Sequence, residues 1–594
     1  MKLSDYIATY LNEAYHVDTV FMVTGGGAMH LNDSFGRCRS IRKVFNHHEQ
    51  ACAIAAEGYF RASGKLCVVN VTTGPGGLNT LTGLLGQWTD SIPVLYVSGQ
   101  VRFDTSVGSC PDISLRQLGD QETDITRVVA PLVKYAAVVK EPAEIKRQID
   151  MAIAIALEGR MGPVWLDIPM NVQGAQVDPE RLVTSERRTP QRGTFDVERL
   201  RKLLEKAQRP VLLAGHGIRL SGSAEAMLSL LETFRVPVVT TFNGYDLIDS
   251  SHPLYVGRLG TVGDRAGNFA VQNSDLLLCI GTRNNIRQIG YNFVTFARSA
   301  TKVIVDIDPA ELEKPTIRPD LKVLMDAGHF IEELKFIASA FEPDKWSEWI
   351  AWCRHRQSKY PVALPEYWDT DELNPYVFIA ELTKRLDKDY IVVAGNGTAC
   401  VCLFQAGIVK KGQRCFWNSG CAAMGYDLPA SIGAAVAFPS RPVVCLAGDG
   451  SLQMNVQELA TVSQNDLDIK LFVLNNGGYI SIKQTQENFF GKPLIGCDPE
   501  SGVSFPQLMG LAAAYGIPFH RIEKKNIEEI DRVLSAKGPC ICEVILQRDY
   551  RFAPKSSSER KPDGRIVSKP LEDLAPFLSR EEFASNMIIA PVKE

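Results

Sequence analysis

The sequence lacks a large excess of charge of either sign, CxxC cysteine pairs and long apolar runs. Its 594 residues carry 64 Lys and Arg against 68 Asp and Glu, a net charge of −4, so the whole molecule does not attract nucleic acid or an anionic membrane. None of its 14 cysteines forms a CxxC pair, which favours buried, reduced thiols and a cytoplasmic location. No stretch approaches 18 uninterrupted apolar residues, and Asp5, Asn12 and Glu13 interrupt the first apolar positions. We therefore expect neither a membrane span nor a signal peptide.

What the sequence does have is a series of short apolar runs, each ending in Gly or a polar turn. Continuous runs of this length are typical of parallel strands that are buried on both faces. The runs are 67–71, 94–97, 211–214, 276–280, 303–307, 391–394, 443–447, 471–474 and 541–545. Amphipathic helical stretches lie between them at 51–61, 197–207 and 456–464. This alternation predicts an α/β protein built of doubly wound parallel sheets.

Two polar stretches without periodicity, 171–195 and 357–374, indicate linkers between domains. They divide the chain into four parts, which are 1–170, 196–345, 375–550 and a tail at 551–594. The first three parts have ordinary domain sizes, and the first and third could share a fold. The tail is charged and loop-like, so we expect it to be ordered only against the body of the protein or a partner.

The strongest local signal lies in the third part, where two predicted strands each end in glycines and a polar side chain. Residues 448–451 read GDGS after the first strand, and residues 475–478 read NNGG after the second. Glycine lets the backbone approach a phosphate closely, and a helix N-terminus supplies free N–H groups. The carboxylate of Asp449 and the amide oxygen of Asn476, together with phosphate oxygens, are ligands that Mg²⁺ prefers. Two ordinary turns are the alternative, which the placement of both motifs at the ends of strands in one βαβ unit disfavours.

The spacing of GDG and NN resembles the signature of thiamine-diphosphate-dependent enzymes. The resemblance implies that Asp449, Asn476 and the backbone carbonyl of Gly478 hold the metal that binds the diphosphate of the cofactor. The neighbouring residues that it implies as cofactor contacts are Gly448, Gly450, Ser451 and Tyr479.

The first part carries further motifs of the same family, which are HEQ at 48–50, TTGPG at 72–76 and TDSIPV at 89–94. By composition alone, Glu49 is a solvated acid at the start of a helix. The resemblance instead implies that Glu49 hydrogen-bonds a ring nitrogen of the cofactor and so promotes loss of the proton from its reactive carbon. It also implies that His48, Thr73 and Gly74 lie at this site.

Two segments between these motifs resemble other parts of the family's cofactor site. NSGCAAMGYDLPASIGAA, at 418–435, resembles the segment under the cofactor ring, where Met424 would force the cofactor to bend. Met in an apolar stretch is more often plain core filling. The family often has Gly at the position of Ala422, whose carbonyl would contact the cofactor. AGNGTAC, at 394–400, resembles the loop at the diphosphate, and its candidate contacts are Asn396, Gly397 and Thr398.

The absence of histidine from residues 98–125 separates the subclasses of this family. Simple decarboxylases carry a His-His pair in this region to protonate the two-carbon intermediate, so its absence favours carbon–carbon bond formation. Over nearly its whole length the chain resembles the catalytic subunit of acetohydroxyacid (acetolactate) synthase. This resemblance implies that Gly25 or Gly26 lines the site, that Gln121 belongs to the catalytic region, and that Lys134 contacts substrate.

The chain also departs from that subunit where the second substrate binds. Asp120 stands where the family has Phe, Lys483 where it has Arg, and Thr485 where it has Trp. Lysine does not replace arginine in a bidentate clamp on a carboxylate. We therefore expect either a 2-oxo acid acceptor or a specialised ketone, such as a nucleotide-linked keto-sugar.

The second part resembles the domain that holds FAD in acetohydroxyacid synthases. The implied flavin contacts are Arg219, Arg283, Asp306 and Asp326. Many relatives keep this domain and lose the flavin, and Val262 stands where the family has His. A purely structural domain therefore remains the alternative.

These patterns together predict a thiamine-diphosphate-dependent carboligase that decarboxylates pyruvate and transfers the two-carbon unit to a carbonyl acceptor. A 2-oxo acid decarboxylase, a lyase or a pyruvate oxidase is the alternative among enzymes, and a non-catalytic regulatory relative is a third reading. The family builds its site between the first domain of one subunit and the third of another, which implies a homodimer or homotetramer.

Overall fold

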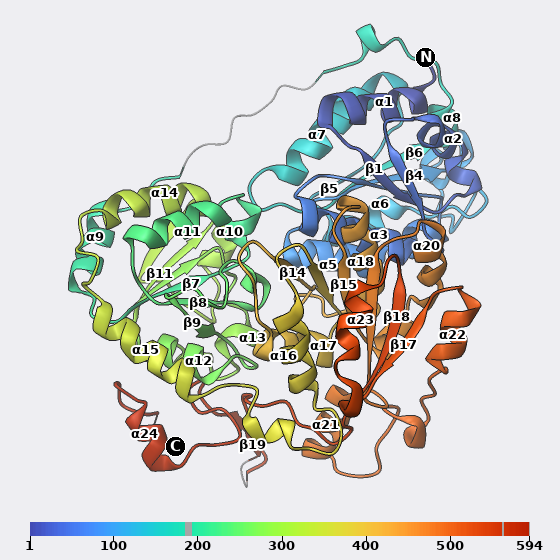
Figure 1. Cartoon of the computed structure of the whole chain (residues 1–594). Helices are drawn as coiled ribbons and strands as arrows, with labels where there is room; N and C mark the ends of the chain where they lie inside the picture. Colours follow the sequence, from blue (N-terminus) through green and yellow to red (C-terminus); the bar gives the residue numbers. More distant parts are fainter. Residues whose placement is uncertain (185–192, 561–562, 593–594) are drawn as a thin grey trace.

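The computed structural model describes residues 1–184, 193–560 and 563–592. It contains three six-stranded sheets whose strands are all parallel (Figure 1), each with helices packed around it. The α/β fold of doubly wound parallel sheets is therefore confirmed. We call the parts of the chain around these sheets the first, central and third domains.

The first domain forms the N-terminal part of the chain. Its strands are β1 (Thr19–Met22), β2 (Arg42–Phe45), β3 (Val68–Val71), β4 (Leu95–Gln100), β5 (Tyr135–Val138) and β6 (Val164–Pro169). Its helices are α1 (Leu3–Tyr15), α2 (Met29–Arg37), α3 (Glu49–Ser63), α4 (Pro75–Leu78), α5 (Leu81–Asp90), α6 (Ile125–Val129), α7 (Ile145–Leu157) and α8 (Met170–Gln173).

The central domain follows the first linker. Its strands are β7 (Pro210–Ala214), β8 (Val238–Thr240), β9 (Tyr255–Arg258), β10 (Leu276–Ile280), β11 (Thr301–Asp306) and β12 (Leu321–Leu324). Its helices are α9 (Val197–Lys206), α10 (Gly217–Leu220), α11 (Ala224–Thr233), α12 (Arg265–Asn273), α13 (Ile286–Ile289), α14 (Ala327–Ala338) and α15 (Ser347–Lys359).

The third domain carries the GDG and NN motifs. Its strands are β13 (Ile391–Ala394), β14 (Arg414–Phe416), β15 (Val443–Gly448), β16 (Ile469–Asn475), β17 (Phe519–Ile522) and β18 (Cys540–Ile545). Its helices are α16 (Pro375–Arg385), α17 (Thr398–Ala406), α18 (Asp427–Ala437), α19 (Asp449–Gln453), α20 (Leu459–Gln464), α21 (Ile480–Phe489), α22 (Leu508–Ala514) and α23 (Glu529–Ser535).

The first and third sheets have the same topology. Their strand orders are β2-β1-β3-β4-β6-β5 and β14-β13-β15-β16-β18-β17, which become identical when each is counted from its own first strand. The central sheet, β12-β11-β10-β7-β8-β9, has a different order whose direction reverses between β7 and β10. Ligands of open α/β sheets bind at the carboxyl ends of strands beside such a reversal.

One hydrophobic core joins the first and third domains. It includes Val69 of β3 and Val443 of β15, and α3 and α18 pack between the two sheets. Because α3 is covered on every side, nearly all of its residues are buried. The expectation of an amphipathic helix at 51–61 is therefore wrong, and the small side chains there serve close packing instead of a solvent-facing surface.

The tail packs on the central domain. It contains β19 (Ser558–Arg560), β20 (Ile566–Ser568) and α24 (Arg580–Ser585). Leu571 lies in the core of the central domain, Asn268 of α12 donates to its carbonyl oxygen at 2.9 Å, and Gln272 donates to Glu572 at 2.5 Å. The described residues of the tail thus pack against the body of the protein.

The linkers are only partly irregular. Residues 185–192 of the first linker lie outside the described residues. In the second, α15 continues to Lys359 and a short 3₁₀ turn covers Pro365–Trp368. Across the described part of the chain, none of the helices has the length and apolar character needed to cross a bilayer. All fourteen cysteines are free, and eleven of them are buried.

Candidate active site

The GDG and NN motifs meet at the carboxyl edge of the third sheet. Asp449 begins α19 directly after β15, and Asn476 follows β16, which is the neighbouring parallel strand. The Asp449 carboxylate accepts hydrogen bonds from the backbone N–H groups of Gly450 at 2.7 Å, Gly477 at 3.0 Å and Gly478 at 3.1 Å. The carboxylate therefore fixes the NNGG turn against the start of α19.

Burial and hydrogen bonding leave oxygen atoms suited to a hard cation. Burial raises the pKa of Asp449 to about 6, although the backbone donors counteract this effect. The Asn476 Oδ1 atom is buried and has no hydrogen-bond partner in the protein. A buried amide oxygen without a partner is costly unless it binds something else, so this donor set fits a bound Mg²⁺. No cluster of three or more His, Cys, Asp or Glu suited to a metal occurs among the described residues.

The glycines of these motifs are required by close contacts. A Cβ atom on Gly450 would lie 2.0 Å from the Cε1 atom of Tyr479. Gly478 has a φ of +149°, and a Cβ there would lie 2.2 Å from the carbonyl oxygen of Cys497. The ring of Tyr479 therefore packs directly on the start of α19, and the turn can adopt this path only with glycine.

The AGNGTAC loop lies beside the NNGG turn at 475–478, which we call the metal loop because it holds the candidate metal ligand Asn476. Gly397 has a φ of +79° and precedes α17, which begins at Thr398. Asn396 Nδ2 donates to the carbonyl oxygen of Ala423 at 2.8 Å, and Asn476 Nδ2 donates to Thr398 Oγ1 at 3.1 Å. The predicted loop at the diphosphate thus contacts both the metal loop and the segment of Met424.

The Met424 segment is attached to α19 and to Asn455 just beyond it, while the Met424 side chain remains accessible. Gly425 donates through its N–H group to Ser451 Oγ at 2.8 Å, and its carbonyl oxygen accepts from Asn455 Nδ2 at 2.8 Å. Met424 is 37% exposed, so it is not core filling. Ala422 has a φ of +56°, a conformation that glycine adopts more readily.

Glu49 is the first residue of α3, and it follows β2 after a short turn. Glu49 is only 9% exposed, and its carboxylate accepts a hydrogen bond from Asn79 Nδ2 at 2.9 Å. Gly76 of the TTGPG motif lies beside the other carboxylate oxygen. His48 caps α3 by accepting from the N–H group of Gln50 at 3.1 Å, so its ring orients the helix that carries Glu49.

The remaining first-domain candidates gather at the ends of β1 and β3, which are adjacent strands. Asn32 donates to the carbonyl oxygen of Gly25 at 3.1 Å, and a Cβ on Gly26 would meet no atom within 4 Å. Thr73 donates to the Gly99 carbonyl oxygen at 2.8 Å. Another glycine of this edge, Gly74, has a φ of +60°, and the Gln121 carbonyl oxygen fills the space that its side chain would need.

Asn455 links the first and third domains of the chain near the candidate residues. Its Nδ2 group donates to Gln50 Oε1 at 3.0 Å as well as to the carbonyl oxygen of Gly425. Gln50 neighbours Glu49, and Gly425 neighbours Met424. Hydrogen bonds from one side chain thus connect the start of α3 to the Met424 segment.

Three predicted substrate contacts have other partners in the chain. Lys134 donates to the Glu158 carbonyl oxygen at 2.5 Å, and Thr485 donates to the Ser481 carbonyl oxygen at 2.9 Å. Lys483 lies 3.6 Å from Asp549 and lines a hollow beside Asn476. Of the three, only Lys483 is therefore next to the metal loop.

Residues without a sequence signal also contribute to the site. They are Asn79, which binds Glu49, Asn455, which bridges the first and third domains, and Tyr550, whose hydroxyl contacts Thr398 and Asn476. Asn79 and Asn455 follow the TTGPG and GDGS motifs closely enough to have been suspected. Tyr550 lies in a stretch with no recognisable motif.

The central domain contains a cleft at the carboxyl ends of its strands. The loops after β7, β10, β11 and β12 line it, together with Asp90 and Ser419 of the other domains, and its empty space including the open mouth is about 890 Å³. A Cβ on Gly217 would lie 2.7 Å from the Cα atom of Gly281, so the loops after β7 and β10 touch. This places the cleft at the reversal of strand order in the central sheet.

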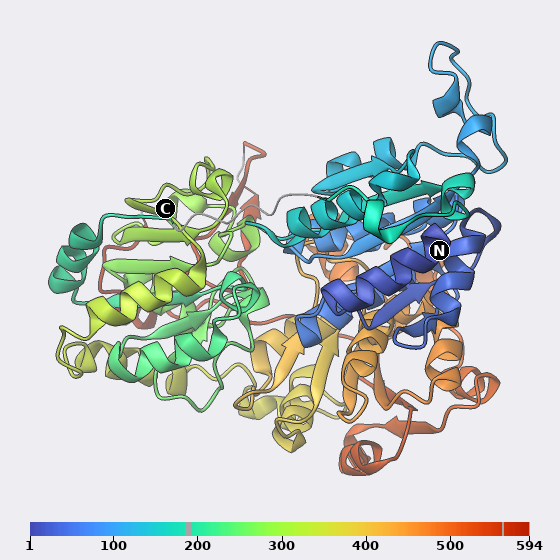
Figure 2. The ribbon, with the colours of Figure 1, turned by 90° about the horizontal axis from the view of Figure 1, so that it is seen from above.

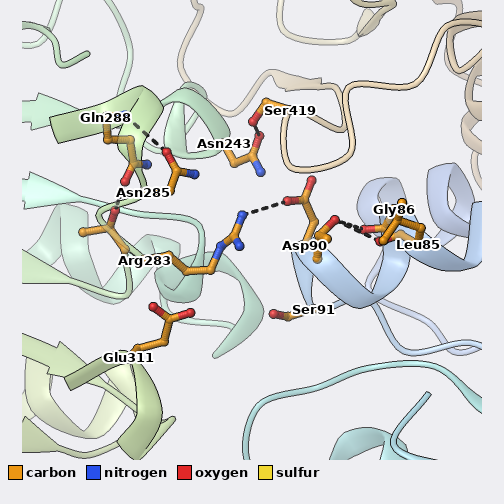
Figure 3. Close-up of polar contacts among 12 residues, drawn as sticks. Leu85, Gly86, Asp90, Ser91, Asn243, Arg283, Asn285, Gln288, Glu311 and Ser419 are labelled. Carbon is orange, nitrogen blue, oxygen red and sulfur yellow. Dashed lines mark hydrogen bonds and ion pairs between the residues drawn. The ribbon is translucent and has the colours of Figure 1, made fainter. Parts of the chain in front are cut away.

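Three of the four predicted flavin contacts, Arg283, Asp306 and Asp326, line this cleft. Figure 3 shows Arg283 pointing at Asp90 of the first domain, with 3.6 Å between Nη2 and Oδ1. Burial raises the pKa of Asp306 to about 6. The fourth predicted contact, Arg219, does not line the cleft, because it binds Asp246 at 3.0 Å.

Comparison with known proteins agrees with this geometry. Family models of thiamine pyrophosphate enzymes match the chain in three places, the N-terminal TPP binding domain at 1–126, the central domain at 197–334 and the C-terminal TPP binding domain at 395–544. The chain is also 32% identical to the acetolactate synthase of Arthrospira platensis, over 91% of this chain and 93% of the relative.

The chain belongs to the thiamine pyrophosphate enzyme family. It is 32% identical to the acetolactate synthase isozyme 2 large subunit of Escherichia coli, with 95% of this chain and 98% of that subunit covered. It is 29% identical to the acetolactate synthase large subunit of Lactococcus lactis over 91% of each chain. The predicted family and its thiamine diphosphate cofactor are therefore confirmed.

Proposed function

We propose that this enzyme decarboxylates pyruvate and transfers the two-carbon unit to a carbonyl acceptor. The observation that carries the proposal is the combination of a buried, oriented Glu49 with a complete metal loop, in a chain that matches acetolactate synthases over nearly its whole length. A non-catalytic relative would have no need to keep Glu49, Asp449 and Asn476. The eleven buried thiols support a cytoplasmic location.

The cofactor requires both a cation and an acid. We infer that Mg²⁺ is held by Asp449, the amide oxygen of Asn476 and the backbone carbonyl of Gly478, together with the diphosphate. The unpartnered Asn476 Oδ1 atom supports this assignment. Bound thiamine diphosphate supplies a nucleophilic carbon and accepts the electron pair that decarboxylation releases.

The protein's own residues orient the cofactor and move its proton. Asn79 fixes one oxygen of Glu49, so the carboxyl group is held to exchange a proton with a ring nitrogen. The half-exposed Met424 would support the bent form of the cofactor from below. Asn396, Gly397 and Thr398 are proposed to face the diphosphate, and His48, Thr73 and Gly74 to shape the other end of the site.

The acceptor is proposed to be a 2-oxo acid or a specialised ketone such as a keto-sugar. Thr485 is exposed on α21, where the family's bulkier tryptophan would stand. Lys483 lies beside the metal loop, and its ammonium group cannot form the paired hydrogen bonds to a carboxylate that an arginine forms. Gly25, Gly26 and Gln121 remain proposed as the wall of the site, and Lys134 as a substrate contact.

We infer a homodimer or a homotetramer. The segment near residue 110 projects from the first domain (Figure 2) and exposes the side chains of Ile113 at 58%, Leu115 at 40% and Leu118 at 50%. Exposed apolar side chains on a projecting segment favour burial against a second subunit. Gln121 follows this segment directly, so a partner would approach the site there.

The central cleft is proposed to hold FAD. We infer that Asp306 and Asp326, which line the cleft, would accept hydrogen bonds from ribose hydroxyls and that Arg283 would bind a phosphate. His216 supports a bound ligand, because its Nε2 atom is buried at the cleft without a protein partner. A yellow purified protein whose flavin absorbance disappears on denaturation and filtration would support this proposal, and a colourless protein that binds no added FAD would contradict it.

Product analysis with pyruvate tests the reaction. Acetolactate formed from pyruvate alone would support the transfer to a second 2-oxo acid. A product formed only when a ketone or keto-sugar is added would support a specialised acceptor. Acetaldehyde or acetate as the main product, with or without acceptors, would contradict the carboligase and support the decarboxylase or oxidase alternative.

A further inference from the structure

Tyr550 brings a hydroxyl group from the end of the third domain into the metal loop. It follows β18 by a short loop and is 5% exposed. Its hydroxyl forms a short hydrogen bond with Thr398 Oγ1 and accepts from Asn476 Nδ2 at 3.4 Å. Since Asn476 Nδ2 also donates to Thr398 at 3.1 Å, the three side chains form a closed triangle.

The triangle places the nitrogen side of the Asn476 amide against the two hydroxyls. The amide nitrogen donates and cannot accept, and the oxygens of Thr398 and Tyr550 lie too close to each other to take one hydrogen each, so they share one of its hydrogens. This leaves the amide oxygen on the opposite side, where it is buried and lacks a protein partner.

The triangle leaves one hydroxyl hydrogen that can bind an anion. One hydroxyl hydrogen is used in the bond between Thr398 and Tyr550. The second hydroxyl hydrogen is left over, because the nitrogen atom of Asn476 cannot accept it. It is therefore available to an oxygen of the diphosphate, beside which Thr398 is proposed to lie.

Tyr550 is held in this position by its own main chain. Gln484 of α21 donates to its carbonyl oxygen at 3.0 Å. Three residues further on, the following chain is fixed by Tyr376, whose hydroxyl accepts from the N–H group of Ala553 at 3.0 Å, and by Gln405, which donates to the Pro554 carbonyl oxygen at 2.6 Å. The backbone that carries the Tyr550 side chain is thus held by contacts outside the metal loop.

We propose that Tyr550 is a positioning residue that, with Thr398, turns the Asn476 amide so that its oxygen faces the metal. The inference rests on the proposed function only in assigning Asn476 as a metal ligand. We therefore expect loss of the Tyr550 hydroxyl to weaken the Mg²⁺-dependent binding of the cofactor and to leave the stability of the fold unchanged.

The test is a titration of the full-length apo protein with thiamine diphosphate at limiting Mg²⁺, followed by tryptophan fluorescence. Tyr550→Phe should weaken binding about tenfold, which corresponds to about 1.4 kcal/mol, while the apo protein keeps its melting temperature. Excess Mg²⁺ should restore binding, because a misoriented ligand lowers metal affinity without removing the site. Thr398→Val should give the same loss from the other side of the triangle, and the double variant should be no weaker than either single variant.

Tyr96→Phe is the matched control, since it removes a buried hydroxyl of β4 that donates to Gln87 and does not touch Asn476. It should bind the cofactor like the wild type. Wild-type affinity in Tyr550→Phe, additive losses in the double variant, or an equal loss in Tyr96→Phe would each overturn the inference. Thr398→Val carries the test alone if Tyr550→Phe does not fold. A wild-type protein that binds no thiamine diphosphate would instead refute the proposed function.

Discussion

Gly433 of α18 lies so close to Ala55 of α3 that a Cβ atom on Gly433 would be 1.9 Å from the Ala55 carbonyl oxygen. This contact holds the first and third domains together in their shared core. Gly433→Ala should therefore force the two helices apart and destabilise the protein by about 3 kcal/mol or more. Thermal unfolding of the purified protein, together with its soluble yield, would measure the loss.

Gly36→Ala provides the control for this substitution. Gly36 is also helical, but a Cβ there would meet no atom within 4 Å. The control should be neutral or slightly stabilised, because alanine is the better helix former. Equal melting temperatures for the Gly433 and Gly36 variants would show that α3 and α18 tolerate separation.

Glu49→Gln should abolish proton exchange at the reactive carbon of the cofactor while leaving the cofactor bound. Glutamine keeps the shape and the contact with Asn79 but cannot exchange the proton, so the exchange rate should fall at least about 1,000-fold. Deuterium exchange followed by NMR measures the rate, and fluorescence titration measures binding. Glu13→Gln, which changes an exposed acid of α1, should have no effect. An unchanged exchange rate in Glu49→Gln would refute the assigned role.

Asp449→Asn should weaken binding of thiamine diphosphate in the presence of Mg²⁺ by at least about 100-fold. The variant loses the negative charge that the cation needs, and it places an amide nitrogen among three backbone N–H donors. Removal of Mg²⁺ with a chelator should have the same effect on the wild type. Asp466→Asn, in an exposed turn with a φ of +45° that asparagine adopts readily, should bind normally. Tight, chelator-resistant binding in Asp449→Asn would argue against a metal at this loop.

Asp167 gives the stability of the protein a defined pH dependence. Burial raises its pKa to about 7, and its neighbours Ser98 and Gln100 donate hydrogen bonds but no positive charge. The unfolded chain releases this proton near the ordinary value of 3.8, so the contribution to stability is full below that pH and is lost as the pH rises through about 7.

Asp167→Asn cannot release this proton. The melting temperature of the variant minus that of the wild type should therefore increase between about pH 4 and pH 7, with an energetic change on the order of 1–4 kcal/mol. Scanning calorimetry of both proteins in matched buffers measures this difference. A difference that stays constant over the range would contradict the assigned titration.

The nine apolar runs of the sequence predicted half of the strands in the three sheets. Each run became part of a strand, because such runs suit the interior of a parallel sheet. The edge strands β2, β5, β12 and β17 were missed, since their residues are partly exposed. The strands β1, β6, β8, β9 and β14 were also missed, although their residues are buried.

Motifs located the residues that end strands, but not the partners that arrive from distant segments. Asp449, Asn476 and Glu49 follow strands in recognisable patterns. Tyr550 reaches Asn476 across 74 residues of sequence, and Asp90 meets Arg283 across a domain boundary. Such contacts depend on how the domains pack, which local patterns do not specify.

The contact between α3 and α18 is reciprocal, because Gly58 of α3 also meets Ala430 of α18, at 2.2 Å from an added Cβ to the carbonyl oxygen. Each helix thus presents an alanine and, three residues later, a glycine to its counterpart. Together with the identical strand order of the two sheets, this gives the chain an approximate internal twofold axis that relates the first and third domains. The two related domains differ in their candidate groups, since the first carries Glu49 and the third carries Asp449 and Asn476. A larger residue at either glycine would meet the backbone of the other helix, so the two helices constrain each other's sequence.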